Sequence, residues 1–548
     1  MEAVKVENLS FAYPDNTKKA LDDVSFCIDS GSFTLLMGES GSGKTTLLKL
    51  LKKEIAPIGE TKGVITISGK KSDEISFNSV GYVAQSPETQ IITDKVWHEL
   101  AFGLESMGLS NDEIRLRVGE TASYFGIGAW YHRDTDTLSG GQKQLLNLAS
   151  VMVMRPDILL LDEPTSQLDP ISASDFLATL KKINCELGIT VIISEHRLEE
   201  VFPAADRVIV LKKGKIITDD TPRRVCVLIK DRPEFEGLPS AVRIWKSLKS
   251  DADCPLSVKE GRDFLDSYYP NIKGKIDVPL IEDGEKAIEF RDVFYRYDRN
   301  LPDVISGMNF YVRKGEIFEI LGENGCGKST LLKVISGLCT PYSGSCTILG
   351  RKIKEYKGNS LYGETLAMLP QDPTVLFLKN TVKEDLQSGW TLSGKKESDF
   401  QKNADKWIDL FGIEPLLSRH PYDLSGGEQQ KCALVKLLLR EPKILLLDEP
   451  TKGLDASFKN SLKQILHTLK EKGITIIAVT HDVEFAADSA DRCGLLFDGK
   501  IIASYQTNRF FSNNTYYTTA ASRIARGRFE NAVRCDEIIS ICKGNDTK

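Results

Sequence analysis

The chain lacks any long hydrophobic run. Apolar stretches such as Ile158–Leu161 and Ile444–Leu447 are short and are each ended by an aspartate, whereas a helix that spans a bilayer needs about 20 apolar residues. The opening residues also lack the basic segment and the apolar stretch of a signal peptide. The sequence therefore predicts neither a membrane span nor a secretory leader.

Paired cysteines and an excess of positive charge are missing as well. The 11 cysteines are an odd number, and none belongs to a C-x-x-C pair. This argues against a disulfide framework or a zinc site and favours a reducing, cytosolic compartment. Lys and Arg number 71 against 77 Asp and Glu, for a net charge of −6. Without a global positive field, nucleic acid is not an expected partner.

What remains is an ordinary globular composition in a long chain. It has 548 residues, of which 41% are hydrophobic and 27% charged, and domains commonly hold about 150 residues. Short apolar runs at Phe33–Met37, Ile158–Leu161 and Thr190–Ser194 alternate with longer helical patterns. The alternation predicts an α/β fold with a largely parallel sheet. The β-rich pieces Val4–Asn8 and Val64–Ile67 favour an additional antiparallel subdomain.

An internal repeat decides the organisation of the chain. GESGSGKTT at Gly38–Thr46 returns as GENGCGKST at Gly322–Thr330, and both LSGG and ILLLDEPT occur twice. The motifs are offset by 284 to 286 residues, so the chain is a duplication of one domain. The predicted parts are a first copy at residues 1–221, a connector at 222–285, a second copy at 286–505 and a tail at 506–548. The connector carries 11 basic and 12 acidic residues and two amphipathic stretches, Ser240–Leu248 and Val258–Tyr269.

The first motif of each copy predicts a phosphate-binding loop. It fits G-x-x-x-x-G-K-[ST] after an apolar strand, a pattern in which glycines let backbone N–H groups converge on phosphate oxygens at a helix N-terminus. Lys44 and Lys328 supply a charge for the phosphates, and the hydroxyls of Thr45 and Ser329 suit a magnesium ion. The alternative, a glycine-rich turn without a ligand, does not explain two copies. Cys326 is interpreted as a small residue in a tight turn, with a redox switch as the alternative.

The residues of the two loops predicted to hold nucleotide are Gly38, Glu39, Ser40, Gly41, Ser42, Gly43, Lys44, Thr45, Thr46, Gly322, Glu323, Asn324, Gly325, Cys326, Gly327, Lys328, Ser329 and Thr330.

Two adjacent carboxylates follow a buried strand in each copy. Asp162 and Asp448 end four-residue aliphatic runs, so each emerges at the carboxyl edge of an α/β sheet, where ligands bind. Both suit magnesium, directly or through water. Glu163 and Glu449 come next and are placed to orient or deprotonate an attacking water. The alternative is a strand that merely ends in a solvated loop.

LSGGQ at Leu138–Gln142 and LSGGE at Leu424–Glu428 resemble the signature of ATP-binding cassette (ABC) ATPases. A serine followed by two glycines at the start of a helix offers a hydroxyl and free N–H groups to an anion, although alone it could be only a helix cap. Each lies 23 residues before the strand-end aspartate. The signature residues expected at the nucleotide are Ser139, Gly140, Gly141, Gln142, Ser425, Gly426, Gly427 and Glu428.

The resemblance implies two P-loop NTPase domains, each with a parallel core sheet, an antiparallel β subdomain and a helical subdomain, that bind ATP and Mg²⁺. It assigns adenine stacking to Tyr13 and Tyr297, for which a strand-packing role is the alternative. Gln85 and Gln371 would act in catalysis and sense magnesium.

His196 and His481 would contact the γ-phosphate, and Asp169 and Asp455 would lie in the loops that link the two sites. In this family two cassettes pair head to tail, and this chain would form such a pair by itself. Lys44 would meet Ser425 and Gly427, and Lys328 would meet Ser139 and Gly141. All motifs are intact in both copies, which predicts two hydrolysing sites.

The segment QSPETQIITDKVWHELAFGLESMGL at residues 85–109 resembles energy-coupling factor (ECF) type importer ATPases. The resemblance places Gln90, Glu99 and nearby apolar residues (Ile91, Ile92, Val96, Trp97, Phe102) in a groove for a membrane partner, with ordinary helical core as the alternative. It implies a transmembrane scaffold and a substrate-binding membrane subunit as partners, peripheral location on the cytoplasmic face of the cell membrane, and import of a vitamin, a precursor or a metal ion. The second interpretation is a soluble tandem ABC ATPase that acts on ribosomes, which the acidic, proline-broken connector disfavours.

Overall fold

The structure, a computed structural model, describes residues 2–14, 18–248, 251–278, 284–356, 360–362, 364–392 and 399–545. These residues form two compact units. The first comprises Met1–Tyr268 together with Asp455–Ser457, and the second comprises Tyr269–Leu454 and Phe458–Lys548. The division falls inside the expected connector, so part of the connector belongs to each unit.

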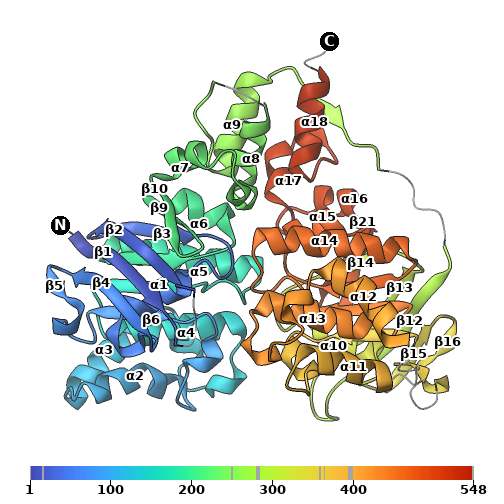
Figure 1. The fold of residues 1–548 in the computed structure, drawn as a ribbon. Helices are drawn as coiled ribbons and strands as arrows, with labels where there is room; N and C mark the ends of the chain where they lie inside the picture. Colours follow the sequence, from blue (N-terminus) through green and yellow to red (C-terminus); the bar gives the residue numbers. More distant parts are fainter. Residues whose placement is uncertain are drawn as a thin grey trace. The chain divides into compact units, whose positions relative to one another are not determined.

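The first copy is built on a six-stranded sheet in the order β10-β9-β3-β8-β7-β6 (Figure 1). All neighbours are parallel except β10, which runs antiparallel to β9. The strands are β3 (Phe33–Met37), β6 (Val80–Val83), β7 (Ile158–Asp162), β8 (Thr190–Ser194), β9 (Arg207–Lys212) and β10 (Lys215–Asp220). Every residue of β3, β7 and β8 is buried, as expected for unbroken aliphatic strands covered on both faces.

A second, antiparallel sheet in the order β2-β1-β4-β5 covers one face of this sheet. Its strands are β1 (Glu2–Ala12), β2 (Leu21–Asp29), β4 (Glu60–Ile67) and β5 (Lys70–Lys71). Alternate residues of the parallel strands, such as Leu36, Leu160 and Ile192, join residues of β1 and β2 in one hydrophobic cluster. The antiparallel subdomain predicted from Val4–Asn8 and Val64–Ile67 is therefore present.

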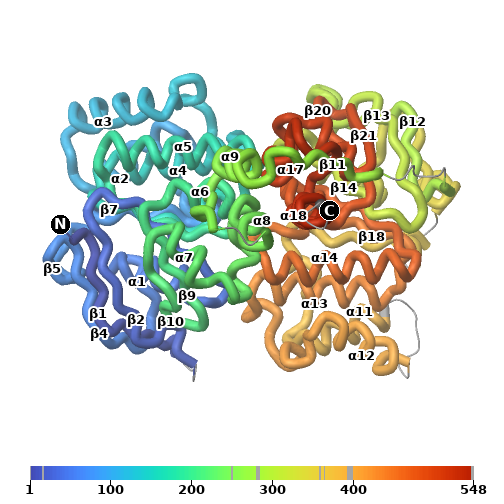
Figure 2. The backbone as a smooth tube through the Cα atoms, turned by 90° about the horizontal axis from the view of Figure 1, so that it is seen from above, coloured from blue at the N-terminus to red at the C-terminus, as the bar shows by residue number. Residues whose placement is uncertain are grey.

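The helices of the first copy are α1 (Lys44–Leu50), α2 (Val96–Ser106), α3 (Asn111–Tyr124), α4 (Gly140–Met152), α5 (Pro170–Leu187) and α6 (Leu198–Ala204). Helices α2 and α3 contact each other and α4 and form the helical subdomain, while α5 also contacts α4 (Figure 2). Helix α1 starts directly after the glycine loop that follows β3, so the loop lies between a rigid strand and a rigid helix.

The second copy repeats this plan, with sheet orders β17-β18-β19-β14-β20-β21 and β13-β12-β15-β16. Its strands are β12 (Lys286–Tyr295), β13 (Ile305–Arg313), β14 (Ile317–Leu321), β15 (Ser343–Ile348), β16 (Arg351–Lys352), β17 (Leu366–Leu369), β18 (Ile444–Asp448), β19 (Thr475–Val479), β20 (Arg492–Phe497) and β21 (Lys500–Gln506). Its helices are α10 (Lys328–Ile335), α11 (Val382–Leu392), α12 (Phe400–Phe411), α13 (Gly426–Leu438), α14 (Ala456–Glu471) and α15 (Val483–Ser489).

The connector and the tail are folded where they are described. Helices α7 (Pro222–Leu228), α8 (Ser240–Leu248) and α9 (Val258–Tyr268) belong to the first unit, and α8 packs against α9. The two amphipathic stretches of the connector are thus helices. In the second unit the short strand β11 (Gly274–Lys275) pairs in parallel with β22 (Phe529–Glu530) of the tail.

The tail also contributes α16 (Thr507–Asn513), α17 (Ala520–Ala525) and α18 (Cys535–Asn545), shown in red in Figure 1. Phe510 and Phe511 of α16 are fully buried in a cluster with Leu321 of β14 and Cys493 of β20. The tail is therefore an integral layer of the second unit, and it also binds the end of the connector through β11.

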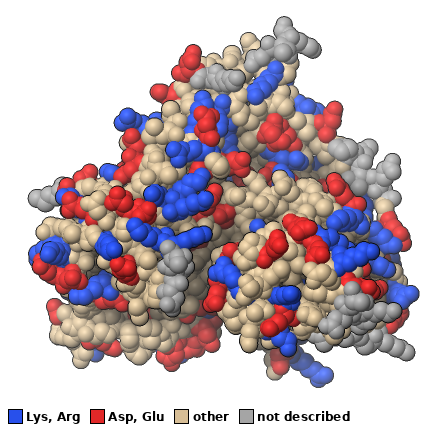
Figure 3. Space-filling view, in the orientation of Figure 1, with Lys and Arg blue, Asp and Glu red and all other residues tan. Residues whose placement is uncertain are grey.

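Acidic and basic side chains are interspersed over the face drawn in Figure 3. This distribution fits the small net charge of the whole chain, −6.

Candidate nucleotide sites

The glycine loops have the backbone that a phosphate site requires. Gly43 and Gly327 cap α1 and α10 with φ of 104° and 103°, a region that side chains other than glycine rarely adopt. A Cβ on Gly43 would lie 2.7 Å from the carbonyl oxygen of Ala20, and one on Gly322 would lie 2.6 Å from that of Leu496. The loops are therefore closely packed on neighbouring backbone, and each leads directly into the N-terminus of the following helix.

The loop lysines are buried and curl over their own loops. Lys44 Nζ donates to the carbonyl oxygens of Gly38 and Glu39 at 2.8 and 3.1 Å. Lys328 Nζ donates to the two equivalent carbonyl oxygens of its own loop, both at 2.9 Å. Burial lowers the pKa of Lys44. An ammonium has three donors, so the two carbonyls leave one for a phosphate oxygen, and a nearby anion would offset the cost of burial.

A hydroxyl and a carboxylate stand together beside each lysine. Thr45 Oγ1 donates to Asp162 Oδ1 at 3.1 Å, and Ser329 Oγ donates to Asp448 Oδ1 at 3.0 Å. Burial raises the pKa of Asp162, and it raises that of Asp448 to about 6. Hard oxygen ligands suit Mg²⁺, and a divalent cation would compensate each buried carboxylate. The residues present therefore fit a magnesium ion.

The carboxylate of the glutamate after each aspartate lies close to the histidine that follows the neighbouring strand. In the first copy Glu163 Oε1 lies 2.9 Å from His196 Nε2, and Glu163 Oε2 accepts a hydrogen bond of 2.7 Å from Gln85 Nε2. In the second copy Glu449 Oε2 lies 2.9 Å from His481 Nδ1. Gln371 is exposed and makes no hydrogen bond to Glu449 within the described residues.

Both glutamates have an unusual backbone conformation and a shifted side-chain pKa. Their φ values of 44° and 49° fall in the left-handed region, and the Glu163 N–H donates to the Ser194 carbonyl at 3.0 Å. Burial acts to raise the pKa of Glu163, but the hydrogen bond and charge of His196 outweigh it, so the pKa lies below its ordinary value. The pKa of Glu449 is lowered in the same way by His481. Each carboxylate is thus ionised and able to accept a proton from water.

The two predicted adenine-stacking tyrosines lie beside the loops. Tyr13 OH and Thr46 Oγ1 are 3.0 Å apart, and Tyr297 OH and Thr330 Oγ1 are 2.9 Å apart. The residues are 37% and 55% exposed, so part of each side chain is accessible to a ligand. Each tyrosine therefore combines a fixed hydroxyl with an available aromatic surface.

Each signature begins a helix as a capping box. Ser139 Oγ accepts from the N–H of Gln142, whose side chain accepts from the Ser139 N–H at 3.0 Å. Ser425 and Glu428 form the same capping box, in which the Ser425 N–H donates to Glu428 Oε2 at 2.9 Å. The helix-cap interpretation of LSGG is therefore correct as local structure, and it leaves the glycines that follow each serine in the first turn of α4 or α13.

Comparison with known proteins settles the family. The ABC transporter family model matches residues 21–166 and 305–452. A Bacillus cereus protein provisionally named an ABC transporter ATP-binding protein is 38% identical over 549 residues, covering 98% of each chain. A Methanosarcina acetivorans protein with the same provisional name is 31% identical and covers 93% of this chain and 87% of its own. The chain belongs to the ABC transporter family.

A solved structure also resembles one cassette. It is titled as cbiO1 from Clostridium perfringens, part of the ABC transporter complex cbiONQ. It is 33% identical, covers 43% of this chain and 97% of its own, and has a TM-score of 0.38.

Family membership confirms the fold and the basic activity. Both ABC cassettes have the P-loop NTPase fold that the family resemblance implied, and the chain is an ATPase that binds ATP with Mg²⁺. Bound Mg²⁺ neutralises charge on the phosphate oxygens and so favours attack by water. Within the described residues, no helix is long and apolar enough to cross a membrane.

Sequence reasoning missed three polar residues of the first ABC cassette. Ser194 Oγ donates to Asp162 Oδ1 at 2.8 Å, and Tyr82 OH donates to Asp162 Oδ2 at 3.3 Å. Glu195 is fully buried and accepts from the N–H and hydroxyl of Thr165 at 2.9 and 2.7 Å. Aligning the two copies could have found them, because Val479, Met368 and Thr480 stand at the equivalent positions.

Proposed function

We propose that this chain is the ATP-hydrolysing subunit of an ECF-type importer, with two nucleotide sites each completed by the signature of the other cassette. The proposal rests first on the likeness of residues 85–109 to that importer type. It also rests on the intact set of loop lysine, strand-end carboxylates, histidine and signature in both copies. ATP would hold the cassettes together, and hydrolysis would release them.

The local structure of residues 85–109 supports a role in docking. The side chain of Gln90 binds the backbone just before this segment. It accepts from the Ala84 N–H at 2.9 Å and donates to the Tyr82 carbonyl at 2.9 Å. Glu99, 5% exposed, accepts from the N–H groups of Ile92 and Thr93 at 3.1 and 2.8 Å. Two polar side chains therefore fix the backbone of a surface segment.

The same segment presents apolar side chains to solvent. Ile92, Trp97 and Phe102 are 69%, 41% and 38% exposed. Val96, by contrast, is fully buried and belongs to the core of the helical subdomain. Large apolar residues exposed on a segment with a fixed backbone suit a protein interface. We infer that a helix of a transmembrane scaffold docks here and that the chain is held at the cytoplasmic face of the membrane.

The second cassette has a related arrangement. Asp385 is fully buried and accepts from the N–H groups of Leu378 and Lys379 at 3.1 Å each, and Lys436 Nζ lies 2.6 Å from its carboxylate. Val375 and Leu378 are 63% and 76% exposed. Two docking segments of different composition suit a scaffold that offers two different helices.

The test is a pull-down of the tagged Glu163→Gln/Glu449→Gln chain with ATP from detergent-solubilised native membranes. We expect a polytopic scaffold and a small hydrophobic binding subunit, whose bound molecule identifies the vitamin, precursor or metal ion carried. Ribosomal proteins in place of these partners would instead favour the tandem ATPase that acts on ribosomes. Recovery of neither membrane subunit would contradict the importer assignment.

A further inference from the structure

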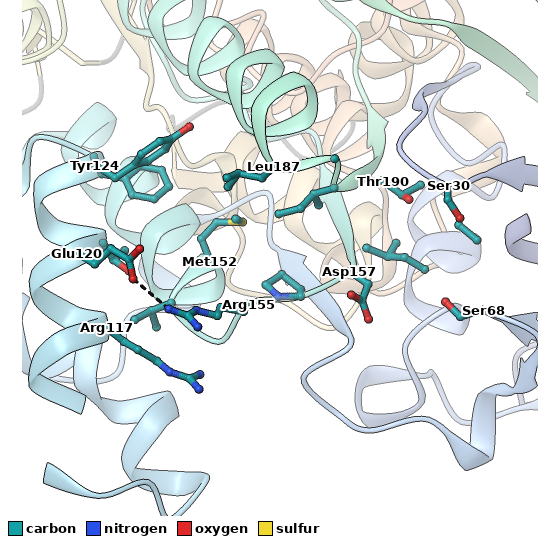
Figure 4. Close-up of a pocket in the computed structure, with 18 residues that line it drawn as sticks. Ser30, Ser68, Arg117, Glu120, Tyr124, Met152, Arg155, Asp157, Leu187 and Thr190 are labelled. Carbon is teal, nitrogen blue, oxygen red and sulfur yellow. Dashed lines mark hydrogen bonds and ion pairs between the residues drawn. The ribbon is translucent and has the colours of Figure 1, made fainter. Parts of the chain in front are cut away.

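A cleft with a volume of about 690 Å³ opens in the first cassette, distant from the predicted catalytic residues. It is lined by the first residues of β7 and β8, by one side of α3 and by the ends of α4 and α5 (Figure 4). Asp162 lies at the other end of β7 from the lining residue Ile158. The volume of the cleft is in the range of small-molecule pockets, roughly 300–1,000 Å³.

Comparison with the second cassette explains why the cleft exists. The sequence Phe-Gly-Ile occurs at the C-terminal end of both α3 and α12, at residues 125–127 and 411–413. With these segments aligned, the lining residue Thr121 of α3 occupies the position of Trp407 in α12. Trp407 is 4% exposed and lies in a cluster with Leu438, Leu439 and Ile474. The first cassette therefore lacks an indole side chain where the second buries one.

Members of the cluster that contains Trp407 can be matched with residues that line the cleft. Leu438, Leu439 and Ile474 are equivalent to Met152, Val153 and Ile189, all of which line the cleft. Lys472 places its Nζ 4.5 Å from the centre of the Trp407 ring, and its equivalent is Leu187, which lines the cleft and is 54% exposed. Three members of the cluster that contains Trp407 therefore have apolar equivalents that line the cleft.

The polar rim of the cleft differs in charge between the cassettes. Arg117, half-buried on α3, makes no ion pair within the described residues, and Asn403 stands at the equivalent position. The other cation on the rim, Arg155, is engaged with Glu120 at 3.0 Å, as the dashed line in Figure 4 shows. Arg117 is therefore the cation at this cleft that is available to a ligand.

We propose that the cleft binds a small molecule that combines a planar fused ring, of the size of an indole, with a carboxylate. The ring occupies the space beside Thr121, Met152 and Leu187, where the Trp407 side chain lies in the second cassette. The carboxylate pairs with Arg117. Burial of the ring supplies most of the affinity, and the charge pair favours anions over neutral analogues. This site is independent of the importer assignment.

The test is calorimetric titration of the full chain with indole-3-acetate and with the neutral indole-3-ethanol. Saturable binding with one molecule per chain is expected for both, with the acetate the tighter. Thr121→Trp, which fills the cleft as Trp407 does, should weaken both by at least tenfold. Ser123→Trp, on an exposed part of the same helix, is the matched control and should leave both affinities unchanged.

Arg117→Gln tests the anion separately and does not require a bulky residue to fold into the cleft. It should remove the preference for the acetate and leave binding of indole-3-ethanol unchanged. Equal losses for both probes, or no loss for either, would overturn the assignment of Arg117. Absence of saturable binding to the unmodified chain, or unchanged binding by a folded Thr121→Trp chain, would overturn the site.

Discussion

The hydroxyl of Ser194 donates a hydrogen bond of 2.8 Å to the buried carboxylate of Asp162. The second cassette has Val479 at the equivalent position, and there Asp448 accepts from Ser329 alone among the described side chains. The two cassettes share every sequence motif, yet the carboxylates predicted to bind magnesium accept different hydrogen bonds. We therefore expect the sites to differ in their dependence on Mg²⁺.

Ser194→Val should weaken magnesium binding at the first site. The change removes a donor that orients the Asp162 carboxylate, and a hydrogen bond to a charged group contributes about 1.5–3 kcal/mol. The Mg²⁺ concentration for half-maximal ATPase activity should rise roughly tenfold. Val479→Ser is the matched variant and should lower that concentration. An unchanged Mg²⁺ dependence in Ser194→Val would show that this hydroxyl does not support the metal site.

Gly43→Ala should abolish ATP binding at the first site. The residue has a φ of 104°, and the added Cβ would lie 2.7 Å from the Ala20 carbonyl oxygen. Gly69→Ala is the control, because Gly69, in the turn between β4 and β5 and outside the loop, also has a positive φ but no atom within 4 Å of its Cβ position. Equilibrium binding of a fluorescent ATP analogue compares the two. Equal affinities would mean that the close backbone contact at Gly43 is unimportant.

Glu319 should make the second cassette less stable as pH rises. Burial raises the pKa of this carboxyl to about 8, and Leu35 occupies the equivalent position in the first cassette. Between the ordinary glutamate pKa of about 4.3 and the folded value, the folded state binds a proton that the unfolded state has lost. The free energy of unfolding therefore falls with pH across that window and levels off above it.

The measurement is the melting temperature of Glu319→Gln relative to the unmodified chain at pH 5.5 and pH 8. The variant should gain stability relative to the unmodified chain as pH rises, because its amide does not ionise. Glu289→Gln, a change at a carboxylate in surface ion pairs with Lys286 and Arg291, is the control and should not show this gain. A constant difference for Glu319→Gln would mean that the carboxyl does not hold its proton.

Trp97→Glu should release the chain from membranes without loss of its own ATPase activity. Trp97 is 41% exposed on the proposed docking segment and is not one of the predicted catalytic residues. Leu116→Glu, at a residue 69% exposed on α3, is the matched control and should remain on membranes. The readout is the fraction of chain that sediments with native membranes. Full retention of Trp97→Glu would place the docking surface elsewhere.

Local patterns were sufficient for the repeated parts of the molecule. Strands β3, β7 and β8, both loops and the positions of Asp162 and Glu163 follow from short motifs, because glycine geometry and buried aliphatic runs act within a few residues. The division of the connector between the two units could not be predicted from such local patterns. It depends on the pairing of Gly274 with Phe529, a contact between segments more than 250 residues apart that no local pattern encodes.

The finer features of the sites arise from tertiary contacts. Ser194 and Tyr82 reach Asp162 from neighbouring strands, and only the folded sheet brings their hydroxyls to its carboxylate. The cleft beside Thr121 is still less visible in the sequence, since it results from a side chain that is small where Trp407 is large. Aligning the two copies identifies both sequence differences. Only the structure shows that one changes the hydrogen bonds of Asp162 and that the other leaves a cleft.

The most direct test of the account is ATP turnover by the purified Glu163→Gln and Glu449→Gln chains, measured separately and together. Each glutamate carboxylate lies 2.9 Å from a ring nitrogen of its own histidine, and we predict that each acts as the base of its own site. We predict that each single variant loses a large part of the activity and that the double variant falls to background. Full activity in either single variant would contradict the claim that both cassettes hydrolyse ATP.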